Sequence, residues 1–226
     1  MKLEFQKSGD GSHTLFRPDI NETYHSHHGA IQESLHVFIQ EGVTYQSNSL
    51  GTDQLSVFEV GYGTGLNALL THLHAKKTGL SVNYETVELF PLEKSIWSAL
   101  NYPNLIEEDL ASPIFEKHHE SIWGEVMVFD DNFHMKKLSG DLMEVKLSGD
   151  FDIVFFDAFA PNKQAEMWEV PVFKKLFDHL KVNGILVTYC ANGQFKRNLK
   201  EAGFRVDSIP GPPGKREMVR GVKLEV

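Results

Sequence analysis

Strands that alternate with helices along this chain predict an α/β fold built on a parallel, doubly wound sheet. Two observations carry the prediction. Five apolar or alternating segments, most of them followed by a helical pattern, are expected to form the parallel strands: 55–59, 81–88, 133–138, 151–157 and 185–190. Two last strands, 204–209 and 216–226, flank the turn Gly211-Pro-Pro-Gly214 and are expected to close the sheet as an antiparallel pair.

The length of the chain bounds its organisation. With 226 residues there is room for one domain with a proper core and not for two large ones. We expect a single domain, 1–226, with an N-terminal extension of strands, loops and a helix over 1–50 and the core over 51–226. Helices are expected over 29–41, 65–77, 92–100, 171–180 and 193–202.

Two segments have weaker patterns. Gly42 is expected to close the first helix, and the polar segment 44–54 is expected to follow it outside any helix. The segment 101–131, with Glu107-Glu108, His118-His119 and Trp123, fits helices with exposed faces and matches no motif.

The segment Val57-Phe-Glu-Val-Gly-Tyr-Gly-Thr-Gly-Leu-Asn67 joins an apolar strand to a helix through three glycines. Glycines allow a sharp turn and a close approach of the backbone to a ligand. A dinucleotide fingerprint needs a further glycine where Leu66 stands, and a pyrophosphate favours a neutral or basic strand end rather than Glu59. The segment therefore favours S-adenosylmethionine, whose sulfonium and ammonium are cationic, over NAD or FAD; the alternative is a merely structural turn. The residues assigned to this cofactor here are Glu59, Gly61, Tyr62, Gly63, Gly65 and Asn67.

Four carboxylates, those of Glu59, Glu88, Asp141 and Asp157, fall at expected strand ends. Ligands of doubly wound sheets bind at the carboxyl ends of the strands, so the four are expected to line one rim. Glu88 follows Gly61 by 27 positions and is expected to accept both ribose hydroxyls, because its two oxygens suit a vicinal diol. Asp141, next to Leu142 in the same cofactor site, is expected to accept from the adenine amino group. The alternative for Glu88 or Asp141 alone is a strand end that faces solvent.

Asp157 is the candidate catalytic residue. The segment Phe156-Asp-Ala-Phe-Ala-Pro161 places it at the mouth of the fourth strand, where it would face both the donated methyl group and the acceptor. An amine acceptor must be unprotonated to attack, and a neighbouring carboxylate can hold it and take its proton.

The net charge of −9 argues against indiscriminate binding to nucleic acid. Positive charge is nevertheless concentrated near the carboxyl end, and the basic patch is expected on Lys196, Arg197, Lys215, Arg216 and Arg220. The alternative is a solvated helix face followed by an exposed hairpin.

Other classes of protein have little support. No apolar run approaches the roughly 20 residues that span a bilayer, so we expect a cytoplasmic protein without a membrane partner. The single Cys190 lies in an apolar run and is expected to be a buried thiol. His25, His27 and His28 lie close together without metal-ligand spacing, and there is no G-x-S-x-G motif of a serine hydrolase, so no metal is expected.

The chain resembles the methyltransferase domain of the MnmC family, whose members complete 5-methylaminomethyl-2-thiouridine at the wobble position of tRNA. Six blocks in order carry the resemblance: Asp10–Thr14; Tyr24–Ser26 with Gly29-Ala30 and Glu33-Ser34; Glu59–Asn67; Glu88–Leu92; Phe156–Asn162 with Met167-Trp168; and Gly214–Met218. The resemblance implies a class I, Rossmann-like methyltransferase sheet and S-adenosylmethionine as the methyl donor. It further implies that the acceptor is the exocyclic aminomethyl nitrogen of 5-aminomethyl-2-thiouridine in tRNA, that Asp157 acts in the active site, and that Tyr24, His25, Lys215 and Arg216 lie on the substrate side.

The chain departs from the family pattern at two residues, in one segment and by the lack of one domain. Tyr62 stands where the family usually has Phe, and Ala158 stands where it has Gly, which bears on the size of the acceptor pocket. The segment 101–131 does not match clearly. The bifunctional members carry a second, FAD-dependent domain that exposes the amine, and 226 residues leave no room for it. We therefore expect a stand-alone methyltransferase without FAD, to which a separate enzyme supplies the aminomethyl base.

Two other functions stay open. An aminopropyltransferase of the spermidine-synthase type, or a methyltransferase of small amines, would share the sheet and the acid at the fourth strand. The basic patch argues against the aminopropyltransferase because it would repel a polycationic substrate. A non-catalytic nucleotide-binding domain is the other alternative, against which the presence of Asp157 and of Lys215-Arg216 argues.

Overall fold

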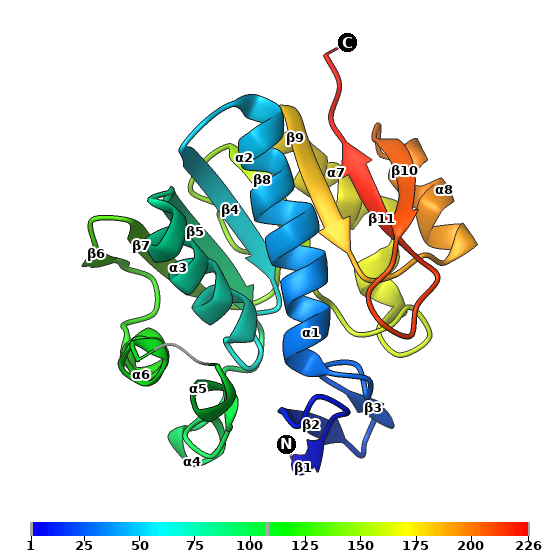
Figure 1. Cartoon of the computed structure of the whole chain (residues 1–226). Coiled ribbons are helices and arrows are strands. Elements are labelled where there is room, and N and C mark those ends of the chain that lie inside the picture. The colour runs from blue at the N-terminus through cyan, green and yellow to red at the C-terminus, as the bar shows by residue number, and fades with distance from the viewer. Residues whose placement is uncertain (1, 107–108, 226) are drawn as a thin grey trace.

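The computed structural model describes residues 2–106 and 109–225, and the core of the fold is an eight-stranded sheet with helices on both faces (Figure 1). Along the sheet the strands follow the order β10-β11-β9-β8-β4-β5-β7-β6. Their bounds are β4 (Gln54–Val60), β5 (Ser81–Glu88), β6 (Val126–Asp130), β7 (Phe133–Ser139), β8 (Phe151–Phe156), β9 (Leu180–Thr188), β10 (Arg205–Pro210) and β11 (Glu217–Val222).

The expected doubly wound sheet is confirmed. β4 pairs in parallel with β5 on one side and with β8 on the other, and β7 and β9 extend these two halves in parallel. β10 and β11 form the expected antiparallel pair, and β11 joins β9. Because the chain order reverses at β4, a crevice is expected at the carboxyl ends of β4, β5 and β8.

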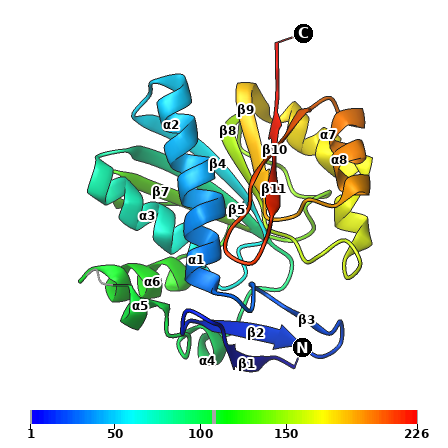
Figure 2. The ribbon, with the colours of Figure 1, turned by 45° about the vertical axis from the view of Figure 1, so that its right-hand side comes forward.

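Helices of the two halves cover opposite faces of the sheet (Figures 1 and 2). One face carries the long N-terminal helix, α3 and α6, and the other carries α7 and α8. The helical bounds outside the N-terminal helix are α3 (Leu66–Thr78), α4 (Lys94–Trp97), α5 (Tyr102–Leu105), α6 (Ala111–Glu120), η2 (Ala165–Trp168), α7 (Val170–Asp178) and α8 (Gly193–Glu201). None of the helices in the described residues is long and apolar enough to cross a membrane.

The first helix is longer than its sequence pattern predicts. It runs without a break through α1 (Ala30–Ser34), the π-helical η1 (Leu35–Thr44) and α2 (Tyr45–Leu50), so the expected end at Gly42 and the non-helical segment after it are wrong. Gly42 serves packing instead, because a Cβ there would lie 3.0 Å from a ring carbon of Phe155. The polar last turns are stabilised by the buried Gln46 amide, which donates to the carbonyl oxygens of Asp152 and Asn183 at 3.2 and 2.9 Å.

The N-terminal residues form a separate three-stranded antiparallel sheet. It consists of β1 (Glu4–Lys7), β2 (His13–Arg17) and β3 (Glu22–Thr23). Figures 1 and 2 place this small sheet beyond the carboxyl ends of the central strands, near the start of α1. The chain that leaves β3 therefore passes over the crevice.

The segment 101–131 contains the expected helices and an additional edge strand, β6. α6 has an exposed face with Glu116 and Lys117, but His118 is on its buried face, so the interpretation of His118-His119 as part of an exposed face is wrong. The pair Glu107-Glu108 lies outside the described residues.

Arg220 was expected in a basic surface patch and is instead 5% exposed. Its Nη2 donates to Glu41 Oε2 at 2.5 Å and to the Glu41 carbonyl oxygen at 3.1 Å, and its guanidinium stacks 3.4 Å from the Tyr45 ring centroid. Arg220 therefore joins the long helix to β11.

This buried contact has a measurable consequence. We expect Glu41→Ala to lower the free energy of unfolding by about 2–3 kcal/mol, because it leaves a buried guanidinium without its carboxylate. Urea unfolding measures the loss. Asp207→Ala is the matched control, since it removes the exposed pair with Arg205 and is expected to cost less than about 0.5 kcal/mol. Equal losses in the two variants would contradict a structural role for the Glu41–Arg220 pair.

Candidate active site

A pocket opens at the carboxyl ends of β4, β5 and β8, where the reversal of strand order places it. Its empty volume is about 1070 Å³, open solvent at the mouth included. Most of the residues that the sequence assigned to the site line it: Tyr24, His25, Gly61, Tyr62, Gly63, Asn67, Glu88, Asp141, Leu142 and Asp157. Glu59, Gly65, Lys215 and Arg216 are not in the lining.

The glycine loop between β4 and α3 forms the floor of the pocket. Gly61, Gly63 and Gly65 have φ values of 90°, 49° and 74°, in the left-handed region that favours glycine. A Cβ on Gly61 would lie 2.9 Å from the carbonyl oxygen of Asp157, and one on Gly63 would lie 3.2 Å from the Tyr24 ring. Glycine is therefore required at these positions both by the left-handed backbone and by the lack of room for a Cβ atom. As a result, backbone atoms of the loop face the pocket.

Glu88 ends β5 and holds the chain on both sides of the pocket floor. Its Oε2 accepts from the Gly63 amide and its Oε1 from the Phe90 amide, both at 2.8 Å. Each carboxylate oxygen has two acceptor sites, so each keeps one for a ligand hydroxyl. The expected role of Glu88 towards a ribose diol is thus compatible with its contacts.

Glu59 lies beneath the pocket and not on its rim. β4 continues to Val60, and the Glu59 side chain is fully buried, with its Oε2 accepting from Thr86 Oγ1 at 2.8 Å. Burial raises the pKa of Glu59 to about 8, against the lowering effect of the Thr86 hydrogen bond. Glu59 is therefore mostly protonated at neutral pH and does not supply the anionic strand end on which the sequence argument for a cationic cofactor relied.

Asp157 lies directly after β8 and faces the pocket. Asn67 Nδ2, from the first turn of α3, donates to Asp157 Oδ2 at 2.8 Å. Burial raises the pKa of Asp157 to about 7; the Asn67 hydrogen bond and the charge of Lys215 lower it, and the charge of Glu33 raises it further. Asp157 can therefore change protonation state near neutral pH, as a proton acceptor for an amine requires.

Lys215 lies behind the pocket wall that Tyr189 forms. Its Nζ pairs with Glu33 Oε2 at 2.6 Å and sits 4.0 Å from the centroid of the Tyr189 ring, which lines the pocket. The neighbouring Arg216 is exposed. Lys215 thus acts on Asp157 through its charge and is not in the pocket surface, and the sequence had assigned no role to Glu33 or Tyr189.

An aromatic wall closes the side towards the small sheet, and of its members the sequence had assigned only Tyr24 to the site. The rings of Tyr24 and Phe159 meet edge to face at 5.1 Å, and the Arg17 guanidinium lies 5.4 Å from the Phe159 ring centroid. Phe159 stood in the block that follows Asp157 and was the available signal. Arg17 reaches the pocket only through tertiary structure.

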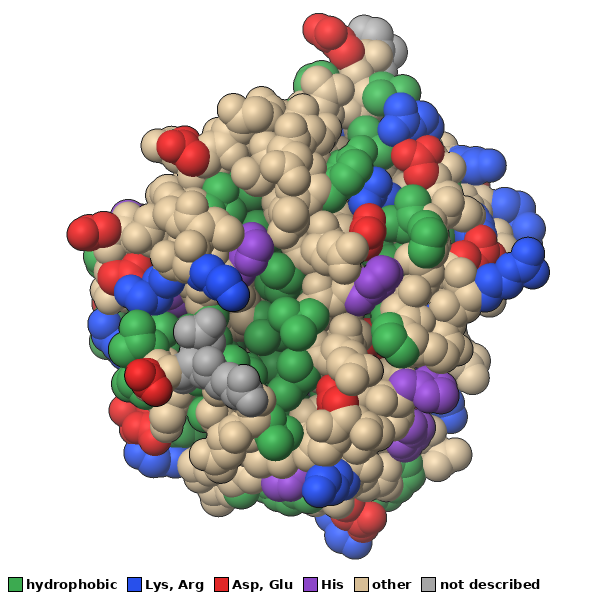
Figure 3. All heavy atoms as spheres, in the orientation of Figure 1, with side chains coloured by type: hydrophobic (Ala, Val, Ile, Leu, Met, Phe, Trp, Pro, Cys, Tyr) green, Lys and Arg blue, Asp and Glu red, His purple; other side chains and the backbone are tan. Residues whose placement is uncertain are grey.

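The remaining basic residues lie on a mixed surface. Figure 3 shows Lys and Arg side chains gathered where Figure 1 places α8 and β10, with acidic side chains among them. Lys196, on α8, pairs with Glu217 at 3.1 Å. Within residues 2–106 and 109–225, no group of three or more His, Cys, Asp or Glu residues is arranged to hold a metal ion.

A family model described as S-adenosyl-L-methionine-dependent methyltransferase matches residues 108–224, just over half of the chain. The chain belongs to this family. Its residues fit the cofactor, because the glycines leave backbone open to a ligand on the pocket floor and the Glu88 carboxylate retains acceptor sites beside them.

The resemblance to MnmC proteins is also confirmed. The chain is 31% identical over 231 residues to the bifunctional tRNA 5-methylaminomethyl-2-thiouridine biosynthesis protein MnmC of Pseudoalteromonas translucida and 27% identical over 212 residues to that of Methylobacillus flagellatus. These matches cover 90% and 89% of this chain but 34% and 32% of the relatives, so the chain spans about a third of their length. The crystal structure of MnmC2 from Aquifex aeolicus matches all of this chain and 71% of that one, with a TM-score of 0.78 and 25% identity.

The pocket geometry makes Glu88 the first residue to test. We expect Glu88→Ala to weaken binding of S-adenosylmethionine about 10- to 100-fold, because charged hydrogen bonds contribute about 1.5–3 kcal/mol and the variant also releases the Gly63 amide. Calorimetry measures the affinity, with the exposed Glu93→Ala as control. Unchanged affinity in Glu88→Ala would remove Glu88 from the cofactor site.

Proposed function

We propose that this protein transfers a methyl group from S-adenosylmethionine to the exocyclic aminomethyl nitrogen of 5-aminomethyl-2-thiouridine at the wobble position of tRNA. The observation that carries the proposal is a carboxyl group, that of Asp157, whose pKa lies near neutrality in a pocket beside the glycine loop. The names of the MnmC relatives support the tRNA base as acceptor. We further propose that residues 1–226 act as a single methyltransferase domain.

The residues of the pocket divide into a cofactor side and an acceptor side. The bound cofactor supplies an electrophilic methyl group on its sulfonium. We place Gly61, Gly63, Glu88 and Asp141 on the cofactor side, where the backbone of the loop and the two carboxylates orient it. Much of the acceleration of such a displacement comes from alignment, for which well-oriented systems gain up to about 7–11 kcal/mol.

The proposed role of Asp157 is to take a proton from the amine acceptor. A primary amine is mostly protonated at neutral pH and cannot attack until it loses a proton. The ionised Asp157 carboxylate accepts a hydrogen bond from the amine and takes its proton, while Asn67 holds Oδ2 and so fixes the direction of the acid. The Lys215–Glu33 pair beside it keeps the pKa of Asp157 within the working range by opposing effects of the two charges.

A macromolecular acceptor must approach from the pocket mouth. The residues proposed for phosphate contacts are Lys196, Arg197, Lys215 and Arg216, of which Lys196 and Lys215 would have to exchange their carboxylate partners Glu217 and Glu33. Arg220 is withdrawn from this set because it is buried. Tyr24, His25 and the aromatic wall are proposed to contact the base. We also propose that a separate enzyme supplies the aminomethyl group.

Asp157→Asn tests the role of the acid through pH. We expect methyl transfer at pH 8 to fall at least about 100-fold, the usual contribution of a general base. The decline of the wild-type rate below pH 7, where Asp157 becomes protonated, should be absent from the variant. Single-turnover rates measure both. A variant within threefold of the wild type, a barrier difference below about 1 kcal/mol, would leave Asp157 a structural strand end.

The same variant has an expected effect on stability, with a defined sign. Folding raises the pKa of Asp157, so the folded protein favours the protonated carboxyl group. The contribution of this group to the free energy of unfolding is fully present below about pH 4 and is lost as the pH rises through about 7. The asparagine side chain of the variant does not ionise. Asp157→Asn should therefore be more stable than the wild type at pH 8, by up to about 4 kcal/mol, and match it near pH 4. Urea unfolding at the two pH values checks this, and equal differences at both would contradict the raised pKa.

The substrate is tested with methyl-labelled S-adenosylmethionine and three acceptors. We expect label in tRNA that carries 5-aminomethyl-2-thiouridine and none in unmodified tRNA or putrescine. Removing one side chain that binds a phosphate should reduce the slope of log affinity against log salt by about 1. The double variant Lys215→Ala, Arg216→Ala should lose more activity than Lys196→Ala, Arg197→Ala. Label in unmodified tRNA or putrescine, but not in the aminomethylated tRNA, would assign the protein to another acceptor.

A further inference from the structure

The back of the glycine loop, on the side away from the pocket, rests against the carboxyl-terminal end of α6. His119 Nε2 donates to the carbonyl oxygen of Thr64, within the loop, at 3.1 Å. A carbonyl only accepts, so Nε2 carries the proton, and burial lowers the pKa of His119 to about 3 and keeps the ring neutral. The sequence pattern of α6 contained no indication of this contact.

Aromatic neighbours fix the His119 ring. It stacks on Trp97 with the centroids 4.7 Å apart and the planes at 8°, and it meets the rings of Phe115 and Tyr62 at 4.6 and 5.3 Å. The loop is fitted closely to it, because a Cβ on Gly65 would lie 2.7 Å from His119 Nε2. Glycine is therefore required at position 65 because φ is 74° and because a Cβ atom would clash with His119.

Lys137, on β7, holds the end of α6 in place. Its side chain is almost completely buried, and Nζ donates to the carbonyl oxygens of His118 and His119 at 2.7 and 3.0 Å. The same ammonium lies 4.7 Å from the Trp123 ring centroid and 5.5 Å from that of Tyr62 in the glycine loop. The carbonyl groups at a helix end otherwise lack intrahelical partners, so Lys137 ties this end of α6 to the sheet.

We propose that His119 and Lys137 are positioning residues for the cofactor loop: they hold its backbone from behind in the shape that binds S-adenosylmethionine, while Glu88 holds it from the front. Neither side chain lines the pocket. Replacing either side chain is expected to lower the fraction of molecules whose loop has the binding shape. The apparent affinity for S-adenosylmethionine then falls in proportion to that fraction. This inference rests on the cofactor site described above and adds two residues that do not touch the cofactor.

His119→Phe tests the proposal, because phenylalanine keeps the aromatic packing and removes the donor to Thr64. We expect about tenfold weaker binding of S-adenosylmethionine by calorimetry, together with faster amide exchange in residues 62–65. His119→Gln retains an N–H in a similar position and should restore affinity to within about threefold of the wild type.

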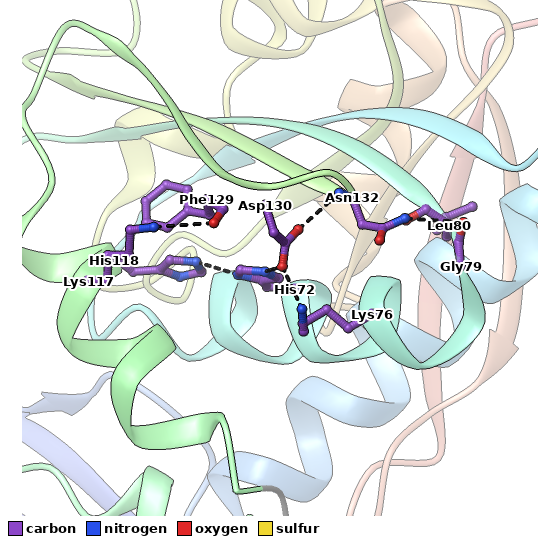
Figure 4. Close-up of polar contacts among 9 residues, drawn as sticks. All are labelled: His72, Lys76, Gly79, Leu80, Lys117, His118, Phe129, Asp130 and Asn132. Atoms are coloured by element: carbon purple, nitrogen blue, oxygen red, sulfur yellow. Dashed lines mark hydrogen bonds and ion pairs between the residues drawn. The ribbon is translucent and has the colours of Figure 1, made fainter.

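His118→Phe is the matched control. His118 precedes His119 on α6 and is fully buried, but its Nε2 faces His72 Nδ1 at 2.9 Å, and His72 in turn contacts Asp130 (Figure 4). Neither partner belongs to the glycine loop. We expect His118→Phe to lower the melting temperature at least as much as His119→Phe and to leave the affinity for S-adenosylmethionine within twofold of the wild type.

The outcomes separate this proposal from the function on which it rests. Absence of binding by the wild type would overturn the cofactor site itself. Wild-type affinity in His119→Phe, or equal weakening in His118→Phe, would overturn only the positioning role. If His119→Phe does not fold, Lys137→Met tests the positioning role instead. This variant replaces a buried cation by an apolar side chain of similar length. It should weaken binding of S-adenosylmethionine at least threefold. Unchanged affinity in a folded Lys137→Met protein would then overturn the proposal.

Discussion

The site depends on the close approach of two parallel strands at their carboxyl ends. β4 passes into the glycine loop, and β8 ends just before Asp157, whose amide donates to the Val60 carbonyl oxygen at 3.1 Å. The 2.9 Å between a Cβ on Gly61 and the Asp157 carbonyl oxygen leaves no room for a side chain between them. The cofactor loop and the acid can therefore be neighbours only if the first loop residue is glycine in a left-handed conformation.

Burial, more than the number of acids, sets the charge of the pocket. Burial raises the pKa values of both Glu59 and Asp157, but the two side chains lie in different places. Glu59 is enclosed in the sheet, where its protonated side chain interacts with Thr86 and supports the floor. Asp157 lines the pocket, so a ligand bound there can reach its carboxyl group, which titrates near neutral pH. Burial thus neutralises Glu59, which its place near the end of β4 had indicated to be anionic.

The proposed acceptor side of the pocket depends on segments far apart in the chain. The small N-terminal sheet supplies Arg17, and the chain after it supplies Tyr24. Outside the pocket surface, α1 supplies Glu33 and the segment between β10 and β11 supplies Lys215, and the charges of this pair act on Asp157. Support from behind the loop comes from α6 and β7. The proposed cofactor half of the site thus comes from the carboxyl ends of the neighbouring strands β4, β5 and β7, whereas the proposed acceptor half also needs the N-terminal extension over the crevice.

The sequence by itself determined the parallel sheet, its closing hairpin, the glycine loop and the place of Asp157 and Glu88, because strand alternation and tight turns are local properties that residue type reports. The tertiary structure alone decided three further points: the continuation of the first helix through Gly42, the burial of Arg220 and Glu59, and the contact of His119 with Thr64. Each depends on what packs against a residue. Residue type alone does not distinguish a glycine that ends a helix from one that makes room for a phenylalanine ring. It also does not distinguish an arginine on the surface from one paired in the interior.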